Sequence, residues 1–103
     1  MREALAECLY ERGQRAYNNR EYKRAAFEWN KGRKAWSEHD GIAQGRRKLE
    51  AVAKDIYNDA VISEREGTER GRDEARRLYE DVLDIAPPGT TYHDKATAKL
   101  EDL

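Results

Sequence analysis

The sequence predicts an all-α fold, and three observations lead to that prediction. Charged residues make up 40% of the 103 residues and only two residues are proline, a composition rich in Ala, Glu, Arg and Lys that favours surface helices over strands. Apolar residues recur at intervals of three and four along most of the chain, which is the spacing of one helix face. No segment alternates apolar and polar residues over the length of a strand.

Turn signals interrupt the helical pattern at four places, so we expect about five helices. The turn signals are Asn18-Asn19, His39-Asp40-Gly41, Gly67 to Gly71, and Pro87-Pro88-Gly89. Asparagine and glycine suit the left-handed residue that ends many helices, and proline stops a helix. The expected helices span residues 2–17, 21–38, 42–66, 72–86 and 91–103.

Each expected helix has an apolar stripe that identifies its buried face. In the first helix the stripe includes Leu5, Cys8 and Leu9, and in the second it includes Trp29 and Trp36. Because the connections are short, sequential helices are expected to pack as antiparallel hairpins.

The last helix has a cap signal of its own. Thr91, followed by Asp94, resembles a capping box at its start.

Length and cysteine content bound the class of protein. A chain of 103 residues is expected to form a single domain with a core that needs no metal or disulfide. Cys8 is the one cysteine, so an intrachain disulfide is excluded and no oxidising compartment is implied. No apolar run approaches the roughly 20 residues of a membrane span, and the first residues lack the apolar core of a secretory signal. We therefore expect a cytoplasmic protein.

The net charge of −1 hides an uneven distribution. Residues 1–19 sum to zero, residues 20–48 carry nine basic and four acidic side chains, and residues 49–103 carry eight basic and fourteen acidic ones. One interpretation is that these charges form ordinary solvated helix faces. The other is a bipolar module whose basic part attracts an acidic partner, or the acidic end of a second copy.

The two halves of the chain share a pattern of spacings. The first and third expected helices have contact positions at Leu9, Arg12, Gly13 and Ala16, and at Leu49, Val52, Ala53 and Ile56. Further positions are Tyr22, Ala25 and Trp29 in the first half, and Ala75, Tyr79, Leu83 and Pro87 in the second. The pattern is similar to that of the tetratricopeptide repeat (TPR) family, in which large apolar, glycine, aromatic and alanine positions alternate and a proline closes the unit. The resemblance covers nearly the whole chain and implies hairpins stacked as a short right-handed solenoid, with residues 91–103 as a capping helix.

The chain departs from the family pattern in composition and in length. Arg12 and Arg33 stand where large apolar residues are usual, and Ser37 replaces the closing proline of the first unit. The interval from Leu9 to Leu49 is 40 residues, against about 34 in the family. The chain is therefore a divergent, TPR-like array. The segment from residue 64 to 71 is either a mobile connection or an insertion specific for a partner.

The resemblance also implies a binding face, because the first helices of TPR units line the concave surface. The positions that carry over are Tyr10, Gln14, Tyr17, Arg47, Glu50, Lys54 and Tyr57. Aromatic and long polar side chains in a groove suit a peptide or a partner helix. The alternative is that Tyr10 and Tyr17 fill the seam between helices. The carboxylate clamp of chaperone-binding members is not expected, because its lysine and asparagine positions are not kept.

The function expected from these observations is a noncatalytic scaffold that binds a protein or peptide. A structural, self-associating (homo-oligomeric) module is the first alternative, with basic and acidic ends meeting. A weak nucleic-acid-binding domain is the second, because Arg46-Arg47-Lys48 forms a basic cluster, although so few phosphate contacts release few counterions.

Enzymatic activity is not expected, nor is a metal or cofactor. His39, His93 and Cys8 are the only soft ligands or nucleophiles, and they are scattered along the chain. The glycines at 67 and 71 follow no strand and lack the lysine and serine of a phosphate-binding loop.

Overall fold

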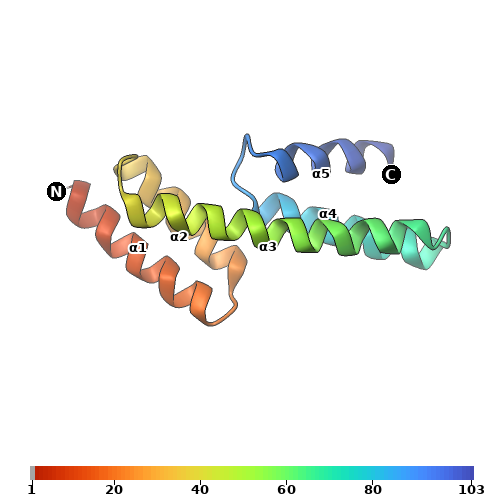
Figure 1. The fold of residues 1–103 in the computed structure, drawn as a ribbon, viewed down its shortest axis with the longest axis horizontal. Coiled ribbons are helices and arrows are strands. Elements are labelled where there is room, and N and C mark those ends of the chain that lie inside the picture. Colours follow the sequence, from red (N-terminus) through yellow and green to blue (C-terminus); the bar gives the residue numbers. More distant parts are fainter. Residues whose placement is uncertain (1) are drawn as a thin grey trace. The chain divides into compact units, whose positions relative to one another are not determined.

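The computed structural model describes residues 2–103 and contains five α-helices joined by short turns (Figure 1). The helices are α1 (Arg2–Asn18), α2 (Tyr22–Ala35), α3 (Asp40–Arg65), α4 (Glu69–Ile85) and α5 (Thr91–Asp102). The described residues include no strand, so the all-α prediction is confirmed, and every predicted boundary lies within three residues of the observed one.

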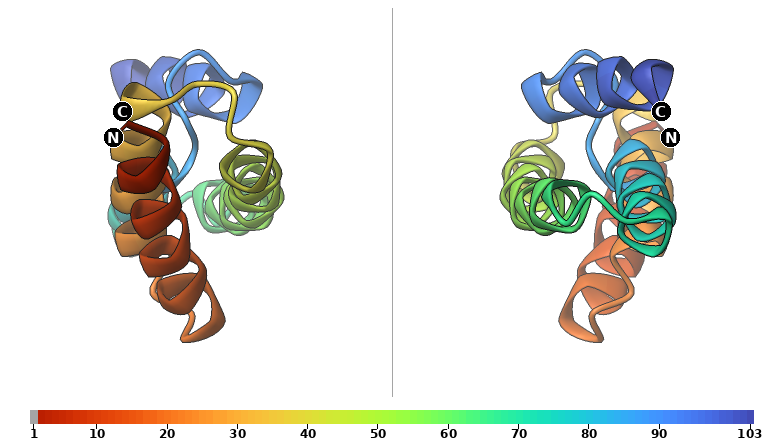
Figure 2. Two further views of the ribbon diagram at one scale, coloured as in Figure 1. Left: turned by 90° about the vertical axis from the view of Figure 1, so that its left-hand side faces the viewer. Right: turned by 90° about the vertical axis from the view of Figure 1, so that its right-hand side faces the viewer.

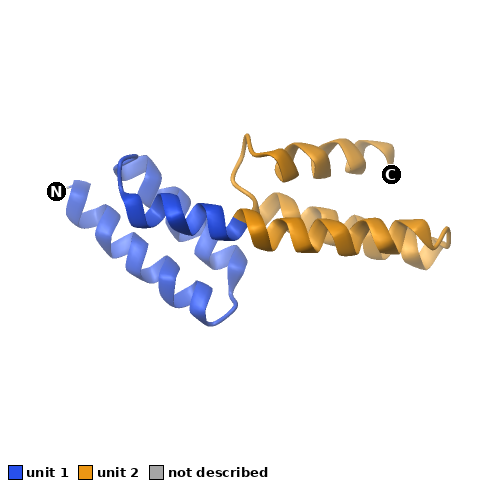
Figure 3. Ribbon diagram, in the orientation of Figure 1, with its two compact units in different colours: residues 1–49 blue, residues 50–103 orange. Residues whose placement is uncertain are grey.

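The helices are grouped in two compact units (Figure 3). Unit 1 ends at Leu49 and contains α1, α2 and the first part of α3. Unit 2 runs from Glu50 to Leu103 and contains the rest of α3 with α4 and α5.

Unit 1 is built around Trp29, whose side chain is fully buried. Its indole Nε1 donates a hydrogen bond of 3.0 Å to the carbonyl oxygen of Tyr10 in α1. Gly13 of α1 and Gly45 of α3 lie against the ring, and a Cβ at either position would overlap it. The small residues therefore allow the close helix approach that the sequence predicts, and the tryptophan fills the resulting space.

The buried stripe of α1 differs from the predicted one. It consists of Ala6, Leu9, Gly13 and Ala16. The prediction that Leu5 and Cys8 face inward was wrong, because Leu5 is 54% exposed and Cys8 is exposed. Contact between Gly13 and Trp29 turns α1 so that Leu9 and the small residues Ala6, Gly13 and Ala16 are buried, while Leu5 lies outside.

The turn after α1 is closed by an arginine rather than by an asparagine. The amide of Glu21 donates to the carbonyl of Ala16 at 2.8 Å, and the amide of Arg20 donates to Tyr17 at 3.0 Å, which is the pairing of a Schellman motif. Arg20 has a φ of 61° and takes the left-handed position. The prediction for Asn18 and Asn19 was therefore wrong, and the chain carries a strained arginine where glycine is the easier residue.

The turn between α2 and α3 also differs from expectation. α2 ends at Ala35 because Trp36 is extended, with its amide bonded to Gly32, so Trp36 is half-buried in the turn and not in the helix core. Gly41 was predicted to stop α2 but lies in the first turn of α3. His39, part of the predicted turn, directly precedes the N-terminus of α3.

In unit 2 the second part of α3, α4 and α5 all contact one another, with ring contacts from Tyr57 of α3 to Tyr79 of α4 and Tyr92 of α5. The right-hand view of Figure 2 shows α3 and α4 side by side, joined by a short loop. The fully buried residues of this unit are dominated by small and β-branched side chains around one tyrosine. They include Ala53, Ala60, Ala75, Tyr79, Val82 and Ala96. Of the α4 positions predicted from the repeat pattern, Ala75 and Tyr79 are fully buried, whereas Leu83 is half-buried.

The starts of α4 and α5 differ from what the sequence pattern predicts, and α5 has no side-chain cap hydrogen bond. Thr68 caps α4, its Oγ1 accepting from the amide of Gly71 at 2.9 Å, so α4 begins three residues earlier than predicted. The residue before α5 is Thr90, not Thr91, and its hydroxyl donates to the carbonyl of Pro87 at 2.7 Å. The predicted capping box at Thr91 was therefore wrong.

The contact between Gly13 and Trp29 predicts an unusual effect of alanine. In an exposed helix Gly→Ala stabilises by roughly 1 kcal/mol, but Gly13→Ala should destabilise by about 1–3 kcal/mol because the new Cβ overlaps the indole. Urea unfolding followed by circular dichroism measures the change. Glu11→Ala, at an exposed site of the same helix, is the control and should change stability little. A stabilised Gly13→Ala variant would contradict the close approach.

Candidate interaction surfaces

The predicted site residues of α1 lie along the seam of unit 1. The Tyr10 ring is 5.0 Å from that of His39, and the Tyr17 ring is 5.5 Å from Tyr22 and 5.9 Å from Trp29. Both tyrosines are half-buried. Contacts of this kind support the alternative in which they fill the seam, while a role in binding stays a prediction.

The remaining predicted site residues are distributed along α1 and α3. Gln14 is half-buried and donates to the side chain of Asn18 at 3.3 Å. Arg47 in unit 1 and Lys54 in unit 2 are exposed, and Glu50 is half-buried. The Tyr57 ring packs 5.5 Å from both Tyr79 and Tyr92 within unit 2. These tyrosines thus make ring contacts inside their own units, and Arg47 and Lys54 are the exposed members of the predicted set.

A groove of about 540 Å³ lies between α1 and α2 of unit 1. We call it the arginine groove, and its lining residues are Arg12, Arg15, Ala16, Asn19, Glu21, Arg24 and Glu28. Among residues 2–103, Arg12 and Arg15 have no ion-pair partner, and Arg24 approaches only Glu21, at 4.0 Å. Sequence reasoning missed this groove and recorded Arg12 only as a departure from the repeat pattern.

The floor of the arginine groove holds a buried carboxylate. The Glu28 side chain is only 9% exposed, and its Oε2 lies 3.6 Å from the ammonium of Lys31. Within the described chain this Oε2 has no hydrogen-bond partner. A buried carboxylate that lacks a hydrogen bond destabilises a fold, so this part of unit 1 is not optimised for stability alone.

A second basic concavity, of about 230 Å³, lies at the end of α2. It is lined by Arg2, Arg33, Lys34, Ala35, Trp36, Ser37 and Glu38. Nearby, partial burial and the charge of Arg33 lower the pKa of the Arg46 guanidinium. Unit 1 thus carries basic side chains on several faces, without enough carboxylates to pair with them.

His39 connects three elements of unit 1. Its Nδ1 accepts a hydrogen bond from the amide of Ile42 at 3.2 Å, so it caps α3, and its Nε2 lies 2.7 Å from Glu7 of α1. The ring also packs against Tyr10 and Trp36. An Nδ1 that accepts requires the Nε2–H tautomer, in which Nε2 donates to Glu7.

The His39 cap predicts different effects of two substitutions. His39→Ala should lower the stability of the chain by about 1 kcal/mol or more, because the amide of Ile42 loses its acceptor. His39→Asn should lose less, since an asparagine oxygen can accept the same bond. Urea unfolding near neutral pH measures both. His93→Ala, at a half-buried histidine of unit 2, is the control. Equal losses for the alanine and asparagine variants would refute the cap.

Unit 2 has a buried tyrosine whose hydroxyl forms a hydrogen bond to a glutamate. Tyr79 is fully buried, and its hydroxyl donates to Oε1 of Glu64 at 2.8 Å. The other oxygen of Glu64 lies 3.6 Å from the ammonium of Lys99 in α5. Burial, and then the hydrogen bond to Glu64, raise the pKa of Tyr79. This contact ties α3 to α4, and Lys99 extends it to α5.

The raised pKa of Tyr79 predicts a loss of stability in alkali. A phenol whose pKa is higher in the folded than in the unfolded state contributes its full stabilisation of the fold below the unfolded pKa of about 10. This contribution is lost as the pH rises above that value, because the unfolded state then ionises more readily than the folded state. Wild type should therefore lose more stability between about pH 8 and about pH 11 than Tyr79→Phe. Urea unfolding at both pH values tests this. The control Tyr92→Phe should lose as much as wild type, and an equal loss in Tyr79→Phe would contradict the assignment.

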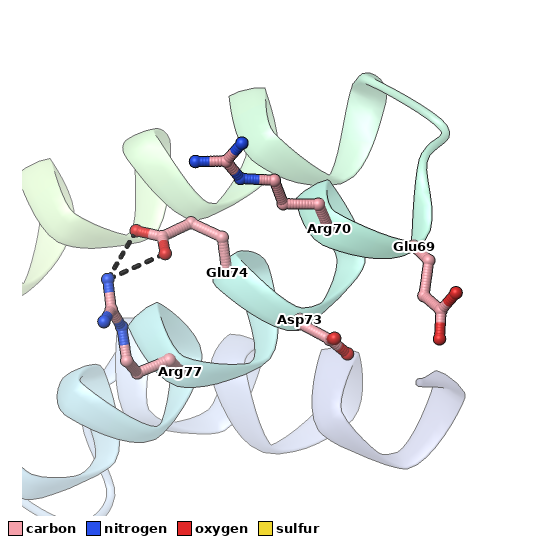
Figure 4. A pocket seen from close by; sticks show the side chains of 5 residues that line it. All are labelled: Glu69, Arg70, Asp73, Glu74 and Arg77. Carbon is pink, nitrogen blue, oxygen red and sulfur yellow. Dashed lines mark hydrogen bonds and ion pairs between the residues drawn. The ribbon is translucent and has the colours of Figure 1, made fainter.

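The outward face of α4 carries many charged side chains. A shallow concavity of about 640 Å³ is lined by Glu69, Arg70, Asp73, Glu74 and Arg77. Figure 4 shows Arg77 bound to both oxygens of Glu74, at 2.8 and 2.7 Å, while Glu69 and Asp73 point away from that pair. With Glu80 and Asp84, which follow at helical spacing, Glu69 and Asp73 form what we call the acidic stripe.

The boundary between the units coincides with the change in charge. Unit 1 has twelve basic and seven acidic residues, a net charge of +5, and unit 2 has eight basic and fourteen acidic residues, a net charge of −6. The two units therefore have net charges of opposite sign.

The described residues, 2–103, show no group of three side chains suited to hold a metal ion. None of their helices is long and apolar enough to cross a membrane.

Comparison with models of known protein families, with curated proteins and with solved structures finds no match.

Proposed function

We propose that the chain is a noncatalytic interaction module, and that its arginine groove binds an acidic segment of a protein. The observation that carries this proposal is that Arg12 and Arg15 are exposed beside each other in a groove and have no ion-pair partner within the described chain. By contrast, Arg76 and Arg77 of unit 2 each pair with a carboxylate three residues away.

Arginine suits this role for physical reasons. A guanidinium presents several donors in a plane and binds a carboxylate through two parallel hydrogen bonds. Arg12, Arg15 and Arg24 approach the groove from two different helices, so they suit carboxylates spaced along an extended or helical segment. Nucleic acid is the weaker candidate, because unit 2 of the same chain carries a net charge of −6 and would repel phosphates.

We further propose that the hairpins form a divergent TPR-like solenoid. Two positions of the repeat pattern support it, because Gly13 lies against the Trp29 ring and Ala25 is fully buried. The concave face predicted from the same resemblance offers Arg47 and Lys54 as exposed contacts.

A labelled acidic helical peptide tests the binding proposal. A peptide of alternating glutamate and alanine blocks should bind in fluorescence anisotropy at about 50 mM NaCl and be released at about 500 mM, where charges are screened within a few ångströms. A glutamine version of the peptide should not bind. Arg12→Glu/Arg15→Glu should weaken binding at least about tenfold, which corresponds to roughly 1.4 kcal/mol.

The matched control changes the same net charge elsewhere in unit 1. Arg33→Glu/Lys34→Glu alters two exposed cations that do not line the arginine groove. It should reduce binding much less than the groove variant. Equal losses in the two variants would show that binding follows net charge and would overturn the assignment to the groove.

A further inference from the structure

We propose that the occupant of the arginine groove is the acidic stripe of α4 in a second copy of this chain. The inference rests on the proposed function of the groove and adds the identity of its partner. The first argument is charge complementarity, because the +5 of unit 1 and the −6 of unit 2 nearly cancel when the two units of different copies meet. Such complementary fields accelerate association and favour the correct orientation.

The second argument is the shape of the acidic stripe. Glu69, Asp73, Glu80 and Asp84 are all exposed. At a helical rotation of 100° per residue they fall within an arc of about 60° and extend over roughly 22 Å of helix. The buried residues of α4, such as Tyr79 and Val82, lie on the opposite side. The stripe is therefore a straight row of carboxylates on the outside of unit 2.

The third argument is the state of the charges on both surfaces. The guanidinium of Arg77 is engaged by Glu74, which lies outside the stripe. Within the stripe, Asp73 pairs with Arg76 at 3.3 Å, and both side chains of this pair remain exposed enough to be reached from solvent. The last turn of α4 contains no basic residue, although cations stabilise the negative C-terminus of a helix. The arginine groove has the reverse composition, with Arg12 and Arg15 lacking a carboxylate. The groove therefore offers guanidinium groups, and unit 2 carries six more acidic than basic residues.

Two different surfaces that bind each other form a heterologous contact. One contact per pair leaves a free groove on one copy and a free stripe on the other, so association continues into chains or a closed ring. Two reciprocal contacts instead make a dimer. Because the contact is made by exposed ion pairs, the association must be weak and sensitive to salt.

Sedimentation velocity on the full chain tests the inference. The weight-average sedimentation coefficient of wild type should rise with protein concentration at about 50 mM NaCl and stay at the monomer value at about 500 mM. Arg12→Glu/Arg15→Glu should remain monomeric at both salt concentrations, and so should Asp73→Arg/Glu80→Arg. The control Arg33→Glu/Lys34→Glu should associate nearly as wild type does.

A mixture of the two charge-reversed variants provides the decisive test. The Asp73→Arg/Glu80→Arg variant retains an intact groove but lacks an acidic stripe. The Arg12→Glu/Arg15→Glu variant retains the acidic stripe but lacks a basic groove. An equimolar mixture should therefore form a complex that stops at two chains. Formation of this complex by two variants that do not associate alone would show that both are folded, and circular dichroism of each variant checks this.

A substitution of Glu28 is expected to strengthen self-association, in contrast to the variants above. Glu28→Gln removes a negative charge from the floor of the groove, so it should strengthen self-association, whereas a variant that only damages the fold would weaken it.

Three outcomes would overturn the inference: self-association that is unchanged in the groove variant, monomeric wild type at low salt, or no complex in the mixture. If wild type is monomeric but the acidic peptide still binds, the proposed function stands and the occupant is another protein. If the peptide also fails to bind, both proposals fall.

Discussion

The burial of Trp29 is the constraint on which the rest of unit 1 depends. The indole needs space that only residues without a side chain provide, and Gly13 and Gly45 provide it from two helices. Its N–H needs an acceptor, which is the carbonyl of Tyr10. Once Gly13 faces the ring, helix geometry turns Arg12 and Arg15 away from it. The core contact and the arginine groove are therefore two consequences of one orientation of α1.

Unit 2 is built around a buried tyrosine instead of a tryptophan, and its surface carries an excess of negative charge. Tyr79 fills the core and its hydroxyl reaches Glu64, which also attracts Lys99. Two of its five arginines pair with neighbours on α4, at 3.3 Å between Arg76 and Asp73 and at 2.7 Å between Arg77 and Glu74. Unit 2 keeps an excess of six acidic residues, whereas Arg12 and Arg15 of unit 1 have no ion-pair partner among residues 2–103.

Helical periodicity was enough to predict the five helices and the central positions of Trp29 and Tyr79, because these depend on spacing along one chain. It could not decide which stripe of α1 is buried, since Leu9 belongs to two overlapping stripes and the choice depends on where Trp29 packs. The cap by His39 was missed because histidine is not a usual cap residue, and its role needs the turn that begins at Trp36. The arginine groove was missed because it is formed by residues of two helices, whose facing sides the sequence does not specify.

Two features of unit 1 reduce its stability, and both adjoin the arginine groove. Arg20 adopts a left-handed conformation that glycine would adopt without strain, directly between the groove residues Asn19 and Glu21. Glu28 keeps a buried oxygen without a hydrogen bond on the floor of the same groove. A surface selected only for stability would replace both residues with simpler ones. Local strain and unsatisfied polar groups gather where a protein binds something, so their shared location independently favours this groove, among the concave surfaces of unit 1, as the place where a partner is held.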